Sequence, residues 1–236
     1  MCHQQLCWEK CSNNYKKMMK KILLILFSCC VLSISAKNNL QLHYDFGKDR
    51  HFVTSTIEHF SIDKYGSTFF FVDLNYKGDA PIEAYWEIAR ELKNWEAPLS
   101  VHLEYNGGLN TFVPINNAYL LGGTYAWNSK DFSKGFSFSA MYKYIQGNAS
   151  AHNFQLTGVW HFHFLKDRIS FLGFADFWRE KQAFLDNSTF IFLTEPQLWY
   201  NINQSFSVGG EVELAWNFAG IKGFKVCPTM GVKWTF

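Results

Sequence analysis

Residues 230–236 read Met230-Gly231-Val232-Lys233-Trp234-Thr235-Phe236, with a large apolar side chain at every second position. This period of two is typical of a β-strand whose two faces meet different surroundings. The last residue is Phe236, and Trp234 stands two positions before it. A terminal aromatic residue on a final amphipathic strand is typical of outer-membrane insertion signals. We therefore interpret Phe236 and Trp234 as an insertion signal for the barrel-assembly machinery.

The same alternation recurs along the chain from residue 40 onward. It is clearest in residues 40–46, 99–105, 136–143, 154–163 and 206–217, and it is weaker in residues 51–60, 67–76, 82–93, 118–127, 169–178 and 189–201. Turn-forming residues separate the segments, for example in 47–50, 77–81, 128–131 and 165–168. Together with the final segment they predict about twelve strands, and an even number is expected of a bacterial barrel.

The aromatic content indicates which face points outward. Aromatic residues make up 19% of the chain, with 24 Phe, 11 Tyr and 9 Trp. A soluble barrel of the lipocalin type would have to enclose these rings, whereas a membrane barrel turns its apolar face to lipid and encloses its polar face. Tryptophans near predicted strand ends also suit interfacial girdles; they are Trp86, Trp95, Trp127, Trp160, Trp216 and Trp234. The sequence therefore favours an all-β fold, a single transmembrane antiparallel β-barrel over residues 37–236, in preference to a soluble barrel.

Residues 1–36 are predicted to be a leader containing a signal peptide. Lys20 and Lys21 precede an apolar run at residues 22–32, and small residues follow up to Ala36, where we place the cleavage site. Because residues 1–17 are polar and precede a complete signal peptide, we expect the true start at Met18 or Met19. The alternatives are a longer pre-region and a lipoprotein signal at residues 26–29.

Removal of the leader changes the cysteine count and the charge. Five of the six Cys lie in it, which leaves Cys227 and excludes an intramolecular disulfide or a Cys-based metal site in the mature chain. The leader also holds five Lys and one Glu, so its removal changes the net charge from +2 to −2. No basic patch remains that would indicate nucleic-acid binding.

Three segments carry a resemblance to a known family. Residues 66–76 (GSTFFFVDLNY), 85–88 (YWEI) and 173–178 (GFADFW) resemble a family of Bacteroidetes outer-membrane proteins that is similar to the Tsx-like nucleoside-specific channel-forming proteins. The resemblance implies a monomeric twelve-stranded barrel with a narrow lumen that passes nucleosides. It also implies that aromatic and ionisable side chains in the lumen contact base and ribose. It is diffuse outside these segments, so it transfers the fold more safely than the substrate.

The alternation assigns a set of polar residues to the lumen. They are His43, Asp45, Asp73, Glu87, His102, Glu104, Lys143, His161, His163, Asp176, Glu195, Glu211, Glu213 and Lys233, and Phe69, Phe71 and Phe174 share the inward face in the segments that resemble the family. Charged and hydrogen-bonding side chains along a pore select solutes, and aromatic rings stack on bases. A lumen without selectivity, closed by its own side chains, is the alternative.

Other chemistry is possible for a few of these residues. His161 and His163 point the same way and could bind a metal with a third ligand from a neighbouring strand. Glu211 and Glu213 could form an acid–base pair, but pairing of these glutamates with Lys233 is favoured. Ser139 or Ser207 with His102 and a carboxylate could form a catalytic triad, as in a lipid-modifying barrel enzyme, although no local signature supports it.

The sequence thus predicts an exported protein of the cell outer membrane that acts as a passive diffusion channel for small polar solutes, with nucleosides as the leading class. We expect it to be a monomer in contact with outer-membrane lipid, with no cofactor, no metal, no nucleic-acid partner and no enzymatic activity. The alternative from a different class is a non-conducting structural or adhesive barrel.

Overall fold

Strands of about ten residues with one apolar face are long enough to cross a bilayer at a tilt, and the structure forms them throughout. The computed structural model describes residues 36–182 and 189–236. Their strands are β1 (Ala36–Asp45), β2 (Val53–Asp63), β3 (Gly66–Lys77), β4 (Ala80–Leu92), β5 (Leu99–Asn110), β6 (Ala118–Asn128), β7 (Lys134–Ile145), β8 (His152–Phe164), β9 (Ile169–Glu180), β10 (Thr189–Thr194), β11 (Gln197–Asn201), β12 (Phe206–Trp216) and β13 (Phe224–Thr235). The predicted leader lies outside the described residues except for its last residue.

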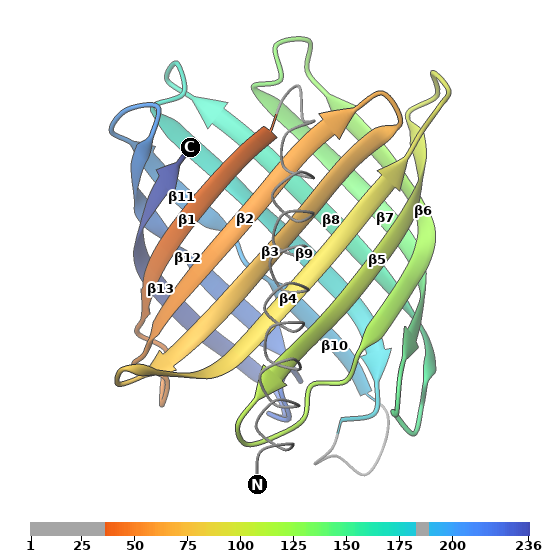
Figure 1. Cartoon of the computed structure of the whole chain (residues 1–236), viewed down its shortest axis with the longest axis vertical. Helices are drawn as coiled ribbons and strands as arrows, with labels where there is room; N and C mark the ends of the chain where they lie inside the picture. Colours follow the sequence, from red (N-terminus) through yellow and green to blue (C-terminus); the bar gives the residue numbers. More distant parts are fainter. Residues whose placement is uncertain (1–35, 183–188) are drawn as a thin grey trace, which may run out of the picture. The chain divides into compact units, whose positions relative to one another are not determined.

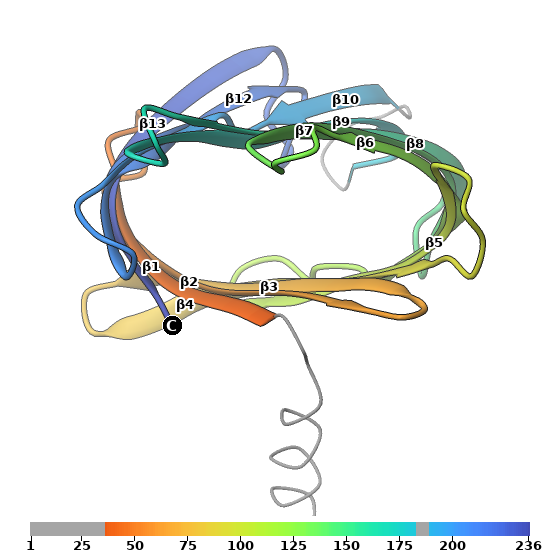
Figure 2. The ribbon, with the colours of Figure 1, turned by 90° about the horizontal axis from the view of Figure 1, so that it is seen from above.

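The strands form one closed antiparallel sheet. Consecutive strands from β1 to β9 are neighbours, and β1 pairs with β13, so the sheet has no free edge. Figure 1 shows the tilted strands from the side, and Figure 2 shows the ring that they form. Closure satisfies the backbone groups of every strand within the sheet, which is the condition for crossing lipid with strands.

Two of the elements, β10 and β11, are pieces of one strand. Both pair with β9 on one side and with β12 on the other, in one continuous register. The break falls at Glu195 and Pro196, and proline has no N–H to donate to the ladder. The Pro196 carbonyl still accepts from the Val212 amide at 3.0 Å. The barrel therefore has twelve strands, and the predicted fold class is confirmed.

The barrel is apolar outside and polar inside. In β1, Leu42 is 46% exposed and its neighbour His43 only 3%. The same contrast runs round the barrel, where exposed residues of the strands are predominantly Phe, Tyr, Leu, Ile, Val and Trp, and buried ones include Gln, His, Asn, Lys and Asp. An apolar exterior around a polar interior is the arrangement of a membrane barrel, and it places Lys143 and Lys233 inside, as predicted.

The two ends of the barrel differ in their connections. The start of β1 pairs with the end of β13, with Asn39 opposite Thr235, so both lie at one end (Figure 1). Connections at that end include residues 64–65, 165–168 and 202–205, whereas the opposite end has 46–52, 111–117 and 217–223. Shorter periplasmic turns and longer outer loops are usual in such barrels.

Several local expectations can be checked directly. The four segments expected to be turns contain connections between strands. In the turn before β7, hydrogen bonds from Ser129 and Ser133 lower the pKa of Asp131 to about 2.

Trp234 and Phe236 are exposed on the outer face with ring centroids 4.8 Å apart, and their role in insertion stays a prediction. Trp86 was wrongly assigned to a strand end, because it lies in the middle of β4.

Within residues 36–182 and 189–236, no helix is both long and apolar enough to cross a membrane.

Candidate functional site

Cross-strand register shows which side chains share the inner face, because directly opposite residues project to the same side of a sheet. From the buried residues of β1, the register carries this face round the whole barrel. It includes His43, Asp45, Phe69, Phe71, Asp73, Glu87, His102, Glu104, Lys143, His161, His163, Phe174, Asp176, Glu211, Glu213 and Lys233. Glu195 lies in the break between β10 and β11. These residues face inward, as the alternation of the sequence predicted, and their role in binding a solute stays a prediction.

One polar cluster lies on the inner faces of β4, β5 and β6. The His102 ring bonds to Glu91 Oε1 through Nδ1 at 2.6 Å and to Glu104 Oε2 through Nε2 at 2.9 Å. Ionised carboxylates only accept hydrogen bonds, so both ring nitrogens act as donors. Thr124 donates to Glu91 at 2.9 Å and bonds Ser139 at 2.7 Å. Within the cluster, one carboxylate oxygen of Glu104 is held by His102.

The hydrogen bonds of this cluster bear on the possible catalytic triad of His102 with Ser139 or Ser207. Both nitrogens of His102 are engaged with glutamates, and Thr124 lies between its ring and Ser139. Ser207 lies elsewhere and donates to Asn201 at 2.7 Å. Neither serine therefore has the histidine available as a base in this arrangement.

A second polar cluster joins β1, β11, β12 and β13. His43 bonds Thr229 at 2.9 Å and Gln41 at 3.0 Å, and its ring meets Trp199 edge-on. Glu211 accepts from Gln197 at 3.0 Å. Trp199 is fully buried, so this part of the interior is closed by packed side chains.

Lys233 does not pair with the glutamates of β12, which corrects the expected ion pairs. Its ammonium lies 4.2 Å from the centre of the Trp199 ring, and cation–π contact of this kind is favourable when the charge is shielded from water. Glu213 instead pairs with Arg50, whose guanidinium also lies 2.7 Å from Asp45. Arg50 comes from the connection after β1, and strand alternation gave no signal that it would fold into the barrel mouth.

A third polar cluster lies on β7, β8 and β9. Lys143 donates to Gln155 at 2.7 Å and sits 4.5 Å from the centre of the Trp178 ring. Thr157 donates to Asp176 at 2.6 Å. Lys143 and Lys233 thus each pack on a tryptophan, and neither tryptophan was expected inside.

Aromatic rings form a row on the inner faces of β3 and β4. Phe69 and Phe71 lie with ring centroids 6.0 Å apart, and Phe71 lies 6.0 Å from Tyr85. Tyr85 donates to Glu87 at 2.6 Å, and it stands opposite Asp73 in the register. Phe174 faces the lumen from β9 and is not part of this row. The row therefore combines apolar rings with carboxylates on one stretch of wall.

The two histidines of β8 do not form a metal centre with other described residues. The rings of His161 and His163 lie 5.8 Å apart, and His163 bonds Ser170 at 2.9 Å. In the part of the chain that the structure describes, no group of three or more His, Cys, Asp or Glu side chains could hold a metal ion.

The interior is packed in one region and reached by solvent in another. Leu120, Met141 and Ile145 form a buried apolar cluster on the inner faces of β6 and β7. By contrast, Val159 faces inward, opposite Ser137 and Phe174, and is still 44% exposed. Solvent therefore reaches the lumen near the middle of β8.

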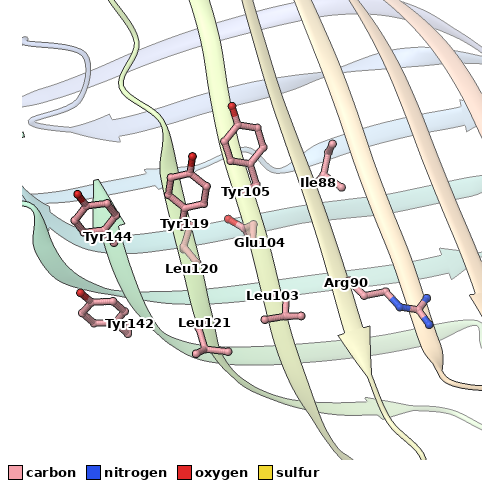
Figure 3. A pocket seen from close by; sticks show the side chains of 10 residues that line it. All are labelled: Ile88, Arg90, Leu103, Glu104, Tyr105, Tyr119, Leu120, Leu121, Tyr142 and Tyr144. Carbon is pink, nitrogen blue, oxygen red and sulfur yellow. The ribbon is translucent and has the colours of Figure 1, made fainter. Parts of the chain in front are cut away.

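A shallow depression lies on the outside of the barrel. It is lined largely by outward-facing side chains of β4 to β7, among them Tyr105, Tyr119, Leu121 and Tyr142 (Figure 3). The Tyr105 and Tyr119 rings lie 5.3 Å apart. Because this face is the apolar exterior, the depression is not part of the lumen.

Comparison with protein families identifies the barrel region. Residues 37–236 match the family described as "Domain of unknown function (DUF5020)". The chain belongs to the DUF5020 family. The matched range coincides with the predicted barrel and leaves out residues 1–36. No curated protein matches the sequence.

Solved structures show what this DUF5020 barrel is similar to. The NanC porin is 10% identical with a TM-score of 0.58, over 84% of this chain and 98% of that one. The KdgM porin is 11% identical with a TM-score of 0.52, over 85% and 99%, and a second KdgM structure, in complex with disordered oligogalacturonate, has a TM-score of 0.51 at 11% identity, over 85% and 99%. At such identity the likeness shows the fold alone, that of a porin-type barrel. The relation to nucleoside-specific channels stays a prediction.

Proposed function

We propose that this DUF5020 protein is a passive diffusion channel of the outer membrane for small, uncharged or cationic polar solutes, and that nucleosides are its leading solute. The observation that carries the proposal is the lumen wall, where aromatic rings and carboxylates stand side by side on β3 and β4. A nucleoside has an apolar base to stack and ribose hydroxyls to donate, and this wall offers partners for both.

The closed barrel supports the channel itself. Its exterior suits lipid, its interior is polar, and the exposure of Val159 indicates that water enters to mid-depth. Selectivity in such pores comes from the charges and hydrogen-bonding groups that line them. In the proposed channel, these groups are the side chains of the inner face.

The charge of the wall argues against acidic solutes. Asp73, Glu87, Glu104, Asp176 and Glu211 all face inward. The KdgM porin has been solved with oligogalacturonate, an acidic polymer, and the carboxylates of this lumen would repel one. The charge of this lining therefore leads us to propose a solute class other than acidic polymers.

Removal of the Phe71 ring tests whether a nucleoside base stacks on it in the lumen. Stacking of one base on an aromatic ring contributes roughly 1–3 kcal/mol, so Phe71→Ala should weaken block of the single-channel current by adenosine about fivefold or more. Phe70 is the matched control, because it is adjacent in sequence and stacks on His59 on the outer face. We expect Phe70→Ala to leave the block unchanged.

Titration of adenosine and of glucose against wild type and both variants in planar bilayers gives the answer. Equal block by the two solutes, or equal loss in both variants, would contradict nucleoside selectivity while leaving a general channel in place.

One observation favours a second candidate, a non-conducting structural barrel. Trp199, Trp178 and Ile191 are buried inside and fill part of the interior. If this packing extends across the lumen, folded protein will carry no current in the same bilayers.

A further inference from the structure

Two hydrogen-bond acceptors on the inner face of β5 lack a partner among the described residues. They are Glu104 Oε1 and Asn106 Oδ1. The Glu104 side chain is 8% exposed and Asn106 is 4% exposed. Buried polar atoms in folded proteins are nearly always hydrogen-bonded, so each exception requires a reason. Residues two apart on a strand project to the same side, and the two orphaned oxygens thus belong to one place on the wall.

The surroundings add further acceptors and few donors. Glu87 stands directly opposite Asn106 in the register of β4 and β5, and its carboxylate accepts from Tyr85. The second oxygen of Glu104 is already held by His102. This wall therefore presents two carboxylates and an amide oxygen with hydrogen-bonding capacity left over.

The inner-face lysine of β7 gives neither orphaned oxygen a hydrogen bond. Lys143 directs its ammonium to Gln155 and onto the Trp178 ring. Asp176, a further carboxylate in electrostatic reach of Glu87, is held by Thr157 and adds to the negative charge. Lys143 is within electrostatic reach of Glu87 and Glu104, and His102 donates to the second oxygen of Glu104. Both offset part of the charge of the β4–β5 wall, but neither gives an orphaned oxygen a hydrogen bond.

The three residues lie about halfway along the barrel wall. Glu87 lies near the centre of β4, and Glu104 and Asn106 lie at the centre of β5. Charges of one sign between low-dielectric walls raise the local concentration of the opposite ion. A cation that crosses the lumen therefore passes close to this wall.

We propose that Glu87, Glu104 and Asn106 form a binding site for the N–H groups of an organic cation of the amine or guanidinium class. Charge-assisted hydrogen bonds to carboxylates are the strong ones, and the guanidinium fork suits several acceptors at once. Both orphaned oxygens are buried, so binding requires rotation of Glu104 and Asn106 toward the lumen. The inference rests on the proposed channel for its role in transport, whereas the binding site can be tested without current.

Agmatine is the probe, because it carries a guanidinium and a primary amine. The matched probe is 1,4-bis(trimethylammonium)butane, a dication of similar length without N–H groups. Isothermal titration of detergent-folded protein should show agmatine binding at least tenfold more tightly than the quaternary dication. Loss of one charge-assisted hydrogen bond typically weakens binding about tenfold or more, and we expect this for Glu104→Gln.

Two further variants separate the site from overall charge and from folding. Asn106→Leu removes an orphaned acceptor without changing charge and should also weaken agmatine binding severalfold. Glu180→Gln removes a lumen carboxylate that already accepts from Trp178 at 2.9 Å, and it should leave binding close to wild type. Every variant must keep the different gel mobility of unboiled and boiled protein that closed barrels show.

The outcomes distinguish this inference from the channel itself. Equal binding of the two dications, no binding, or equal loss in Glu104→Gln and Glu180→Gln would overturn the site, whatever the protein conducts. Selective agmatine binding that depends on Glu104 and Asn106 would support it, even in a protein that carries no current.

Discussion

Replacement of Arg50 by methionine should lower the free energy of unfolding by about 3–5 kcal/mol, the usual cost of leaving a buried charge without its partner. The guanidinium lies 2.7 Å from both Asp45 and Glu213. The side chains of these two acids are 2% and 12% exposed, so water reaches them poorly. Arg50 itself is 23% exposed, which favours the lower part of the range. Urea titration of the protein in lipid vesicles, followed by tryptophan fluorescence, measures the change.

The double variant Arg50→Met with Glu213→Gln shows whether the cost is electrostatic. Removal of one stranded carboxylate should recover part of the lost stability, because the penalty comes from the unpaired charge and not from the missing side chain. A change below about 1 kcal/mol for Arg50→Met, the range of exposed ion pairs, would show that the three groups are solvated and not buried together.

An arginine in place of Leu103 should destabilise the folded barrel by about 2–4 kcal/mol, the cost of a charge turned to lipid at mid-depth. Leu103 lies near the middle of β5 on the outer face and is 40% exposed. The same urea titration in vesicles gives the value, and Leu103→Ala controls for the lost apolar contact.

The matched position is Val159, an aliphatic residue of similar exposure near the middle of β8 that faces the lumen. Val159→Arg places the charge in the part of the lumen that solvent reaches, and we expect a change within about 1 kcal/mol. Equal costs at the two positions would contradict the assignment of outer and inner faces.

The strands were predictable because each carries its own signal. Alternation over about ten residues indicates a strand without knowledge of its partners. Residues 189–201 were read as one strand, and they act as one although Pro196 interrupts the ladder. The inner face was predictable for the same reason. When apolar and polar residues alternate along a strand in a membrane, the apolar side must face lipid and the polar side must face the lumen.

The contacts inside the barrel were not predictable from alternation. Arg50 and Glu213 are 163 positions apart, and their meeting depends on closure of the sheet through β1 and β13. The expected pair of Lys233 with the β12 glutamates failed because Trp199, on β11, lies against the ammonium. Glu91 carried a usable signal, since it follows Glu87 at an even spacing on β4 and so shares its face.

The most direct test of the central claim is the single-channel current of the folded protein in a planar bilayer. Protein whose gel mobility changes on boiling, and which is therefore folded, should give discrete current steps that persist over a range of voltages. Such steps are the result expected of a barrel whose polar lumen is continuous from one end to the other. Absence of current from folded, inserted protein would contradict the channel and favour the structural barrel.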